Sequence, residues 1–164
     1  GGHPFPRKTN QMIHLQNLKF VNVTGPISVD NASNTTATID TLGFDYAVIV
    51  VHSGLLEVAM TALKVQESDD SGMSGAADVD GLVFGTSTNI DGSTSALPAA
   101  GDDNVFHLFE IDLKARKRYL DVVSTQGNGS GTGGLVAISC ILGRAAESPA
   151  DTAAGKGAAE VLRA

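Results

Sequence analysis

The segment 105–142 contains three runs of apolar and polar residues that follow one another without a helical pattern. The runs are VFHLFEIDL (105–113), RKRYLDVVST (116–125) and, after a glycine-rich turn, GLVAISCIL (134–142). Consecutive strands that are joined by short polar segments are typical of an antiparallel sheet. This part of the chain therefore predicts an all-β protein.

Shorter runs predict five further strands before residue 105. They span 18–23, ending at Gly25-Pro26, then 36–40, 44–51, 55–67 and 79–84. The run 44–51 is almost entirely apolar and rich in valine, which indicates a strand buried on both sides or at the centre of a sandwich. Eight strands in all suit an antiparallel β-sandwich or jelly-roll-like single domain.

The segment 55–67 fits two kinds of secondary structure. Its residue types favour a helix, and alternate residues from 59 to 65 fit one face of a strand. A helical face would consist of Leu55, Val58, Ala59, Ala62 and Leu63. Because a glycine-containing turn precedes the segment and its neighbours are strands, we predict a strand.

Residues 13–145 are predicted to form the sandwich domain, with an extended segment at each end. Residues 1–12 form an N-terminal arm, in which Pro4 and Pro6 flank Phe5 and cannot donate to a strand ladder. Residues 146–164 form a tail rich in alanine, glycine and glutamate. A long Gly/Ser/Thr/Asp-rich connection at 86–103 is expected on the surface.

Charge and composition exclude several classes of partner. Among 164 residues, 18 are acidic and 11 are basic, so the net charge is −7. Such a surface disfavours direct binding to nucleic acid and to anionic membranes. The apolar window 46–63 is interrupted by His52-Ser53-Gly54 and Glu57, so it predicts two elements joined by a turn rather than a membrane span. Residues 1–10 lack the apolar core of a signal peptide, and we expect a soluble protein.

A glycine-rich run at 129–134, GSGTGG, matches the dinucleotide-binding fingerprint literally. That fingerprint requires a helix N-terminus directly after it to receive the pyrophosphate. Here the following residues predict a strand, so the run is expected to be a flexible hairpin loop. No cofactor is predicted.

The acidic segment 67–78 imitates a calcium-binding loop, with oxygen-bearing residues at its first, third and fifth positions and Gly72 at the sixth. Its first residue is Glu67, its twelfth is the short Asp78, and no helix pair flanks it. We expect a solvated acidic loop and no metal site.

The remaining polar residues give no catalytic pattern. The four histidines lack the spacing of zinc ligands, and His107 is expected to be a satisfied core residue on the face of Phe109 and Ile111. There is no nucleophile elbow or phosphate-loop lysine, and the single Cys140 excludes an internal disulfide. We therefore predict that the protein is not an enzyme. Four Asn-x-Ser/Thr sequons are attributed to chance; they begin at Asn22, Asn31, Asn34 and Asn128.

The only dense positive cluster consists of Lys114, Arg116, Lys117 and Arg118. One interpretation is a hydrated turn whose charges discourage edge-to-edge pairing of strands. The other is an ionic contact to an acidic partner.

Three short segments resemble capsid decoration, or cement, proteins of tailed bacteriophages. They are LKVQESDD (63–70), KRYL (117–120) and ILGRAAESP (141–149), within a region of resemblance that covers 44–149. The resemblance implies a β-rich trimer on the outer surface of the virion head, where it clamps neighbouring subunits of the major capsid protein. On this basis the candidate partner contacts are Phe5, Arg7, Lys8, Lys114, Arg116, Lys117 and Arg118.

Two other functions remain open at this stage. One is a sugar- or receptor-binding β-module of a phage tail or fibre, with 86–103 as its binding loop. The absence of Trp and the presence of only two Tyr disfavour this function. The other is a β-sandwich hydrolase with an unrecognised site.

Overall fold

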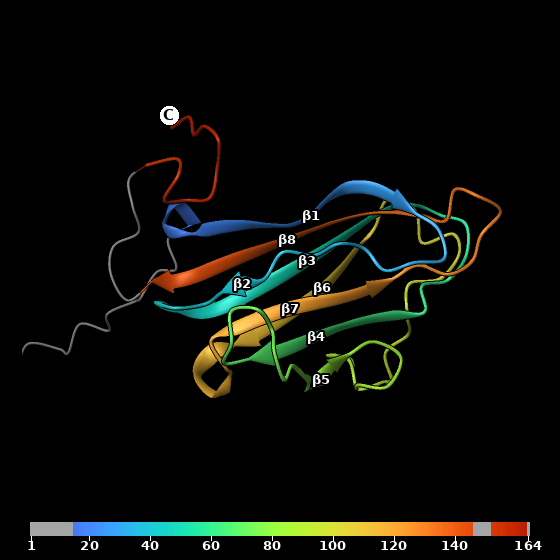
Figure 1. The fold of residues 1–164 in the computed structure, drawn as a ribbon, viewed down its shortest axis with the longest axis horizontal. Coiled ribbons are helices and arrows are strands. Elements are labelled where there is room, and N and C mark those ends of the chain that lie inside the picture. Colours follow the sequence, from blue (N-terminus) through green and yellow to red (C-terminus); the bar gives the residue numbers. More distant parts are fainter. Residues whose placement is uncertain (1–14, 146–151, 164) are drawn as a thin grey trace, which may run out of the picture.

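The structure is a computed structural model that describes residues 15–145 and 152–163. Eight strands form two antiparallel sheets of four strands each (Figure 1). Two short 3-10 helices, η1 (Leu15–Asn17) and η2 (Leu113–Ala115), accompany them. The strands are β1 (Lys19–Val29), β2 (Ile39–Asp40), β3 (Phe44–Leu56), β4 (Ala62–Ser68), β5 (Ala77–Val83), β6 (Phe106–Asp112), β7 (Tyr119–Thr125) and β8 (Gly134–Ala145).

The order of the strands is that of a jelly roll. One sheet has the order β1-β8-β3-β6, and the other has the order β2-β7-β4-β5. The chain thus folds back on itself so that β1 pairs with β8, β2 with β7, β3 with β6 and β4 with β5, all antiparallel. Two stacked four-stranded sheets in this order form two Greek keys. The predicted all-β sandwich is confirmed.

The core lies between the sheets and is almost entirely aliphatic. Every second residue is buried along β7 and from Ala47 to Ser53 in β3, as expected when each strand turns one face inward. Fully buried side chains of this kind contribute about 1.5–3 kcal/mol each. The largest of them are Ile39, Ile49, Met60, Leu63, Leu120, Ile138 and Leu142.

Two predicted strand boundaries are wrong. Gly25-Pro26 does not end the first strand, because β1 continues to Val29 with register shifts between Asn22 and Thr24 and between Thr24 and Ile27. β1 is an edge strand, where a proline can direct its missing donor away from the sheet. The predicted turn at 52–54 is also wrong, since β3 extends through Leu56 and the chain reverses only at 57–61.

The ambiguous segment 55–67 contains no helix. Its first residues complete β3, and its last residues form most of β4. The strand interpretation is therefore confirmed for 62–67, and the helical spacing of its apolar residues is coincidental. Among the described residues, no helix is long and apolar enough to span a membrane.

Both ends of the domain lie at the same end of the sandwich. Lys19 of β1 pairs with Leu142 of β8, so the chain enters and leaves the jelly roll side by side. Residues 152–163 return to this corner in a series of turns, where the backbone N–H of Phe20 donates to the Lys156 carbonyl at 2.9 Å (Figure 1). The N-terminal arm, residues 1–12, lies outside the described residues.

Candidate functional site

The outward-facing side chains of the two sheets differ sharply in chemistry. On the β2-β7-β4-β5 sheet they include Asp40, Lys64, Gln66, Asp78 and Asp121. On the β1-β8-β3-β6 sheet, three strands carry no charged side chain at their outward positions over long stretches. These stretches are 20–22 in β1, 46–52 in β3 and 135–141 in β8. We call this second surface the apolar face.

Strand register assembles the apolar face in rows. Phe20, Ile141, Val48 and Glu110 lie side by side in one row, and Asn22, Ser139, Val50 and Leu108 form the next. A third row contains Ala137, His52 and Phe106, with the His52 and Phe106 rings 4.5 Å apart. With strands about 4.8 Å apart, the four strands present a surface roughly 19 Å wide.

Side chains on the apolar face are open to solvent at its borders. Phe106 is 64% exposed, Leu108 is 47% exposed and Phe20 is 45% exposed. Contiguous exposed apolar surface of this kind marks interaction sites in soluble proteins. The apolar face is therefore the strongest candidate for a contact surface among the described residues.

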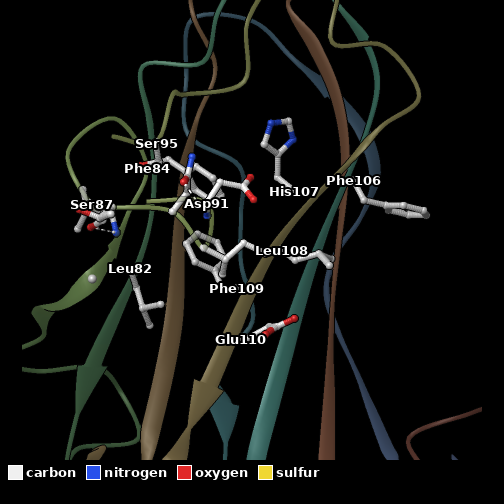
Figure 2. Close-up of a pocket in the computed structure, with 15 residues that line it drawn as sticks. Leu82, Phe84, Ser87, Asp91, Ser95, Phe106, His107, Leu108, Phe109 and Glu110 are labelled. Carbon is white, nitrogen blue, oxygen red and sulfur yellow. Dashed lines mark hydrogen bonds between the residues drawn. The ribbon is translucent and has the colours of Figure 1, made fainter. Parts of the chain in front are cut away.

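A groove runs along β6, at the open side of the sandwich. It has a volume of about 540 Å³ and lies between the edge strands β5 and β6 and the loop 87–95. Phe84 packs against Phe109 with ring centroids 5.0 Å apart, and Leu82 and Ile90 extend the apolar lining. Figure 2 shows Phe109 turned toward Phe84, whereas Phe106 lies on the opposite side of β6. We call this feature the edge groove.

His107 lies at the edge groove and differs from the prediction of a satisfied core histidine. Its ring is only partly buried and packs edge-on against Phe84, with centroids 5.6 Å apart. Its Nδ1 is buried and has no hydrogen-bond partner among the described residues. Burial lowers the pKa of His107, an effect that the negative charge of Asp102 partly opposes.

The basic cluster is largely engaged within the protein. Arg116 lies 3.5 Å from Glu67, and Lys117 lies 3.7 Å from Asp69. Arg118 makes a two-pronged contact, in which its Nε and Nη2 each donate to an oxygen of Asp40 at 2.9 Å. Of the four cluster residues, Lys114 alone has no ion pair with the described part of the chain, and it is exposed.

The Asp40–Arg118 pair joins β2 to the start of β7. The hydrogen bonds from Arg118 lower the pKa of Asp40, and the same bonds raise the pKa of Arg118. Arg118 also stacks over the ring of Tyr119 at 4.9 Å from its centroid. This geometry indicates a structural role for Arg118, so a partner contact through Lys114 is the part of the cluster prediction that the structure favours.

The acidic residues of 67–78 point to different partners. Asp70 accepts from the backbone N–H groups of Gly72 and Ser74, as in a tight polar turn. Asp78 accepts from Lys64 and Gln66, and the latter bond is the main cause of its lowered pKa. In the described ranges no three His, Cys, Asp or Glu side chains are grouped as metal ligands.

The glycine-rich segment connects the two sheets, so its prediction as a hairpin is wrong. β7 and β8 belong to different sheets, and 126–133 crosses between them. Backbone N–H groups of Ser130, Thr132 and Gly133 donate to one oxygen of Glu57, at 3.2, 3.2 and 2.8 Å. A carboxylate of the protein itself thus occupies the place where such loops hold a phosphate.

We expect the contact between Glu57 and the glycine-rich segment to weaken in acid. The bond from Gly133, the largest contribution, lowers the pKa of Glu57 from its ordinary 4.5. Its ionised form is favoured in the fold, so this stabilisation is present above pH 4.5 and is lost as pH falls through the lowered pKa. In an NMR titration, the amide signals of Ser130, Thr132 and Gly133 should shift with a midpoint below 4.5.

The Glu57→Gln variant should abolish this shared transition, whereas Asp80→Asn, which removes an exposed carboxylate of β5, should leave it unchanged. Amide shifts that persist in Glu57→Gln would refute the assignment to Glu57.

The other sequence-predicted residues divide into two groups. Phe5, Arg7 and Lys8 lie outside the described residues, as do His3 and His14. Cys140 is fully buried between the sheets, where desolvation raises the pKa of its thiol to about 12.

Sequence reasoning missed the apolar face and the edge groove. The signal for the first is the near-continuous apolar composition of 44–51, which predicted a buried or central strand, and of 134–142, which predicted only a strand. No protein-family model, curated protein or solved structure matches the chain.

Proposed function

We propose that this protein is a structural component of a tailed-phage virion, a decoration protein that binds the outside of the head and clamps neighbouring major capsid protein subunits. The observation that carries the proposal is the apolar face opposite a polar, charged face on a single jelly roll. Jelly rolls serve as capsid and lectin domains, and fold alone does not decide between them. The sequence resemblance to decoration proteins favours the capsid role.

In this proposal the apolar face is buried between copies of the chain in a homotrimer. Copies with a net charge of −7 repel one another, and the apolar face is where they can approach with the fewest charges opposed. Within the described strands, its charged outward positions are Glu110 and Asp112, both on the edge strand β6. The trimer leaves the polar face and Lys114 to contact the capsid.

The test is binding to heads of the phage that encodes the protein. Purified protein mixed with emptied heads should co-sediment at saturating occupancy and raise the temperature at which the heads break. The variant Lys114→Gln should lower occupancy, because it removes the one cation of the basic cluster that has no ion pair within the described residues. Asn128→Asp, which makes the same change in charge in the crossover loop, is the matched control and should bind normally. Protein found in tails and absent from heads would refute the proposal.

A second candidate function is sugar or receptor binding through the edge groove. The observation in its favour is that Ser87, Asn89 and Asp91 of the predicted binding loop line the groove. Its lining contains no Tyr, which suits stacking on sugars poorly. A specific signal from the full chain on a glycan array, lost in Asn89→Ala, would favour this function over the decoration role.

A further inference from the structure

β6 is the one long edge strand in the described sandwich that lacks any feature that would hinder pairing with an additional strand. β1 has two register shifts and a backbone contact to Lys156, β5 has a register shift, and β2 is two residues long. β6 instead pairs with β3 in unbroken register from Phe106 to Asp112. Its sequence, FHLFEID, has no proline, glycine, lysine or arginine. A flat, uninterrupted edge of this kind can accept an additional strand.

The edge groove lies directly beside this free edge. Its volume of about 540 Å³ falls within the range of binding pockets. Phe84 and Phe109 provide aromatic surface, and Ile90 on the loop wall is 96% exposed. An extended segment along β6 would therefore gain both backbone hydrogen bonds and a hydrophobic contact.

Residues 3–8, HPFPRK, have the composition of a strand that can pair on one side only. In an extended chain, residues two apart direct their N–H groups to the same side. Pro4 and Pro6 therefore place both missing donors on one side and leave the N–H groups of Phe5 and Arg7 on the other. Such a segment can pair with one edge and cannot propagate the sheet further.

Charge also matches this segment to the groove. Residues 3–8 carry Arg7 and Lys8 and no acidic residue, in a chain with a net charge of −7. The groove lining contains Asp91 and Glu110, both exposed, and no lysine or arginine. Opposite charges at an exposed rim favour association and set its register.

We propose that residues 3–8 of one copy add as an extended strand to β6 of a second copy, with Phe5 in the edge groove and Lys8, on the other face of the strand, near Glu110. The described chain starts at Leu15 beside β1, at the opposite edge of the same sheet. A segment that docked on its own β6 would have to cross the apolar face, which the proposed trimer buries. The exchange needs no capsid, so its failure would leave the head-binding proposal intact.

The experiment is disulfide trapping between two full-length variants. Lys8→Cys protein is mixed with differently tagged Glu110→Cys protein under mild oxidation. The buried Cys140 thiol does not compete. We expect a mixed cross-linked dimer on a non-reducing gel. Phe5→Ser introduced into the Lys8→Cys protein should lower its yield about tenfold or more, because the aromatic contact is lost.

Ser71→Cys, an exposed position on the polar loop between β4 and β5, replaces Glu110→Cys in the control. If Ser71→Cys cross-links to Lys8→Cys in the same yield as Glu110→Cys does, the proposal is overturned. It is also overturned if Phe5→Ser leaves the yield of the Lys8→Cys/Glu110→Cys dimer unchanged. A variant that carries both Lys8→Cys and Glu110→Cys tests the exchange directly. If its disulfide forms only within single chains, the exchange between copies is overturned.

Discussion

Gly133→Ala should destabilise the protein by about 2–5 kcal/mol. Gly133 has a φ of +65°, in the left-handed region. A Cβ at this position would collide with the carbonyl oxygen of Val29 and lie 2.7 Å from its carbonyl carbon. Because these are backbone atoms at the end of the β1–β8 ladder, a side-chain movement cannot relieve the overlap. A backbone shift that relieved the overlap would also pull the Gly133 N–H away from Glu57.

Denaturant unfolding measures this loss, and thermal unfolding should show a Tm lower by roughly 5–15 °C. The matched control is Gly25→Ala in β1, where an added Cβ meets nothing within 4 Å and φ is not positive. Its unfolding free energy should stay within about 0.5 kcal/mol of the wild type. Equal stability of the two variants would mean that the chain does not approach Val29 closely at Gly133.

Val50→Glu should convert the proposed trimer to monomers. Val50 lies in the middle of the apolar face, between Leu108 and Ser139. Burying an unpaired carboxylate there costs several kcal/mol per copy, so the dissociation constant should rise at least about 100-fold. Mass photometry and light scattering on the purified protein measure the change.

Val123→Glu is the control, because Val123 faces outward from the centre of the opposite, polar sheet and pairs with Lys64. It introduces the same side chain, and the trimer should persist. Circular dichroism on both variants separates dissociation from unfolding. A wild-type protein that stays monomeric at high concentration would refute the self-association role of the apolar face.

Much of the fold could be predicted because alternation of apolar and polar residues is a local property. The three strands between 105 and 142 follow directly from it, as does β2, whereas most of β3 follows from the continuous apolar run 44–51. Gly25-Pro26 misled the prediction because a proline is compatible with an edge strand, and edge position depends on the pairing of β1 with β8. The length of β3 was likewise underestimated, since Ser53 is buried through hydrogen bonds to the carbonyls of Asp102 and Val105.

The candidate site was largely inaccessible from the sequence, because it depends on which strands become neighbours. The run 44–51 was expected to be buried on both sides or at a sandwich centre. β3 is central in its sheet, but Val48 and Val50 face outward and are only partly covered. The basic cluster was predicted as a unit, yet its acidic partners Asp40 and Glu67 lie about 50 to 80 residues away in sequence. Only the folded register brings these groups together.

The chain enters β1 and leaves β8 at the same end of the sandwich. This arrangement determines how far the opposite end would stand from a surface that binds the two termini. β3 begins at Phe44, opposite Ala145 at the exit corner, and ends at Leu56, opposite Gly134 at the far end. Its 13 residues span roughly 40 Å. A copy anchored by its termini would therefore hold the 57–61 and 126–133 loops at the far end of the sandwich, about 40 Å from that corner. A peptide inserted at Asn128 would be displayed at the tip, away from the anchored end.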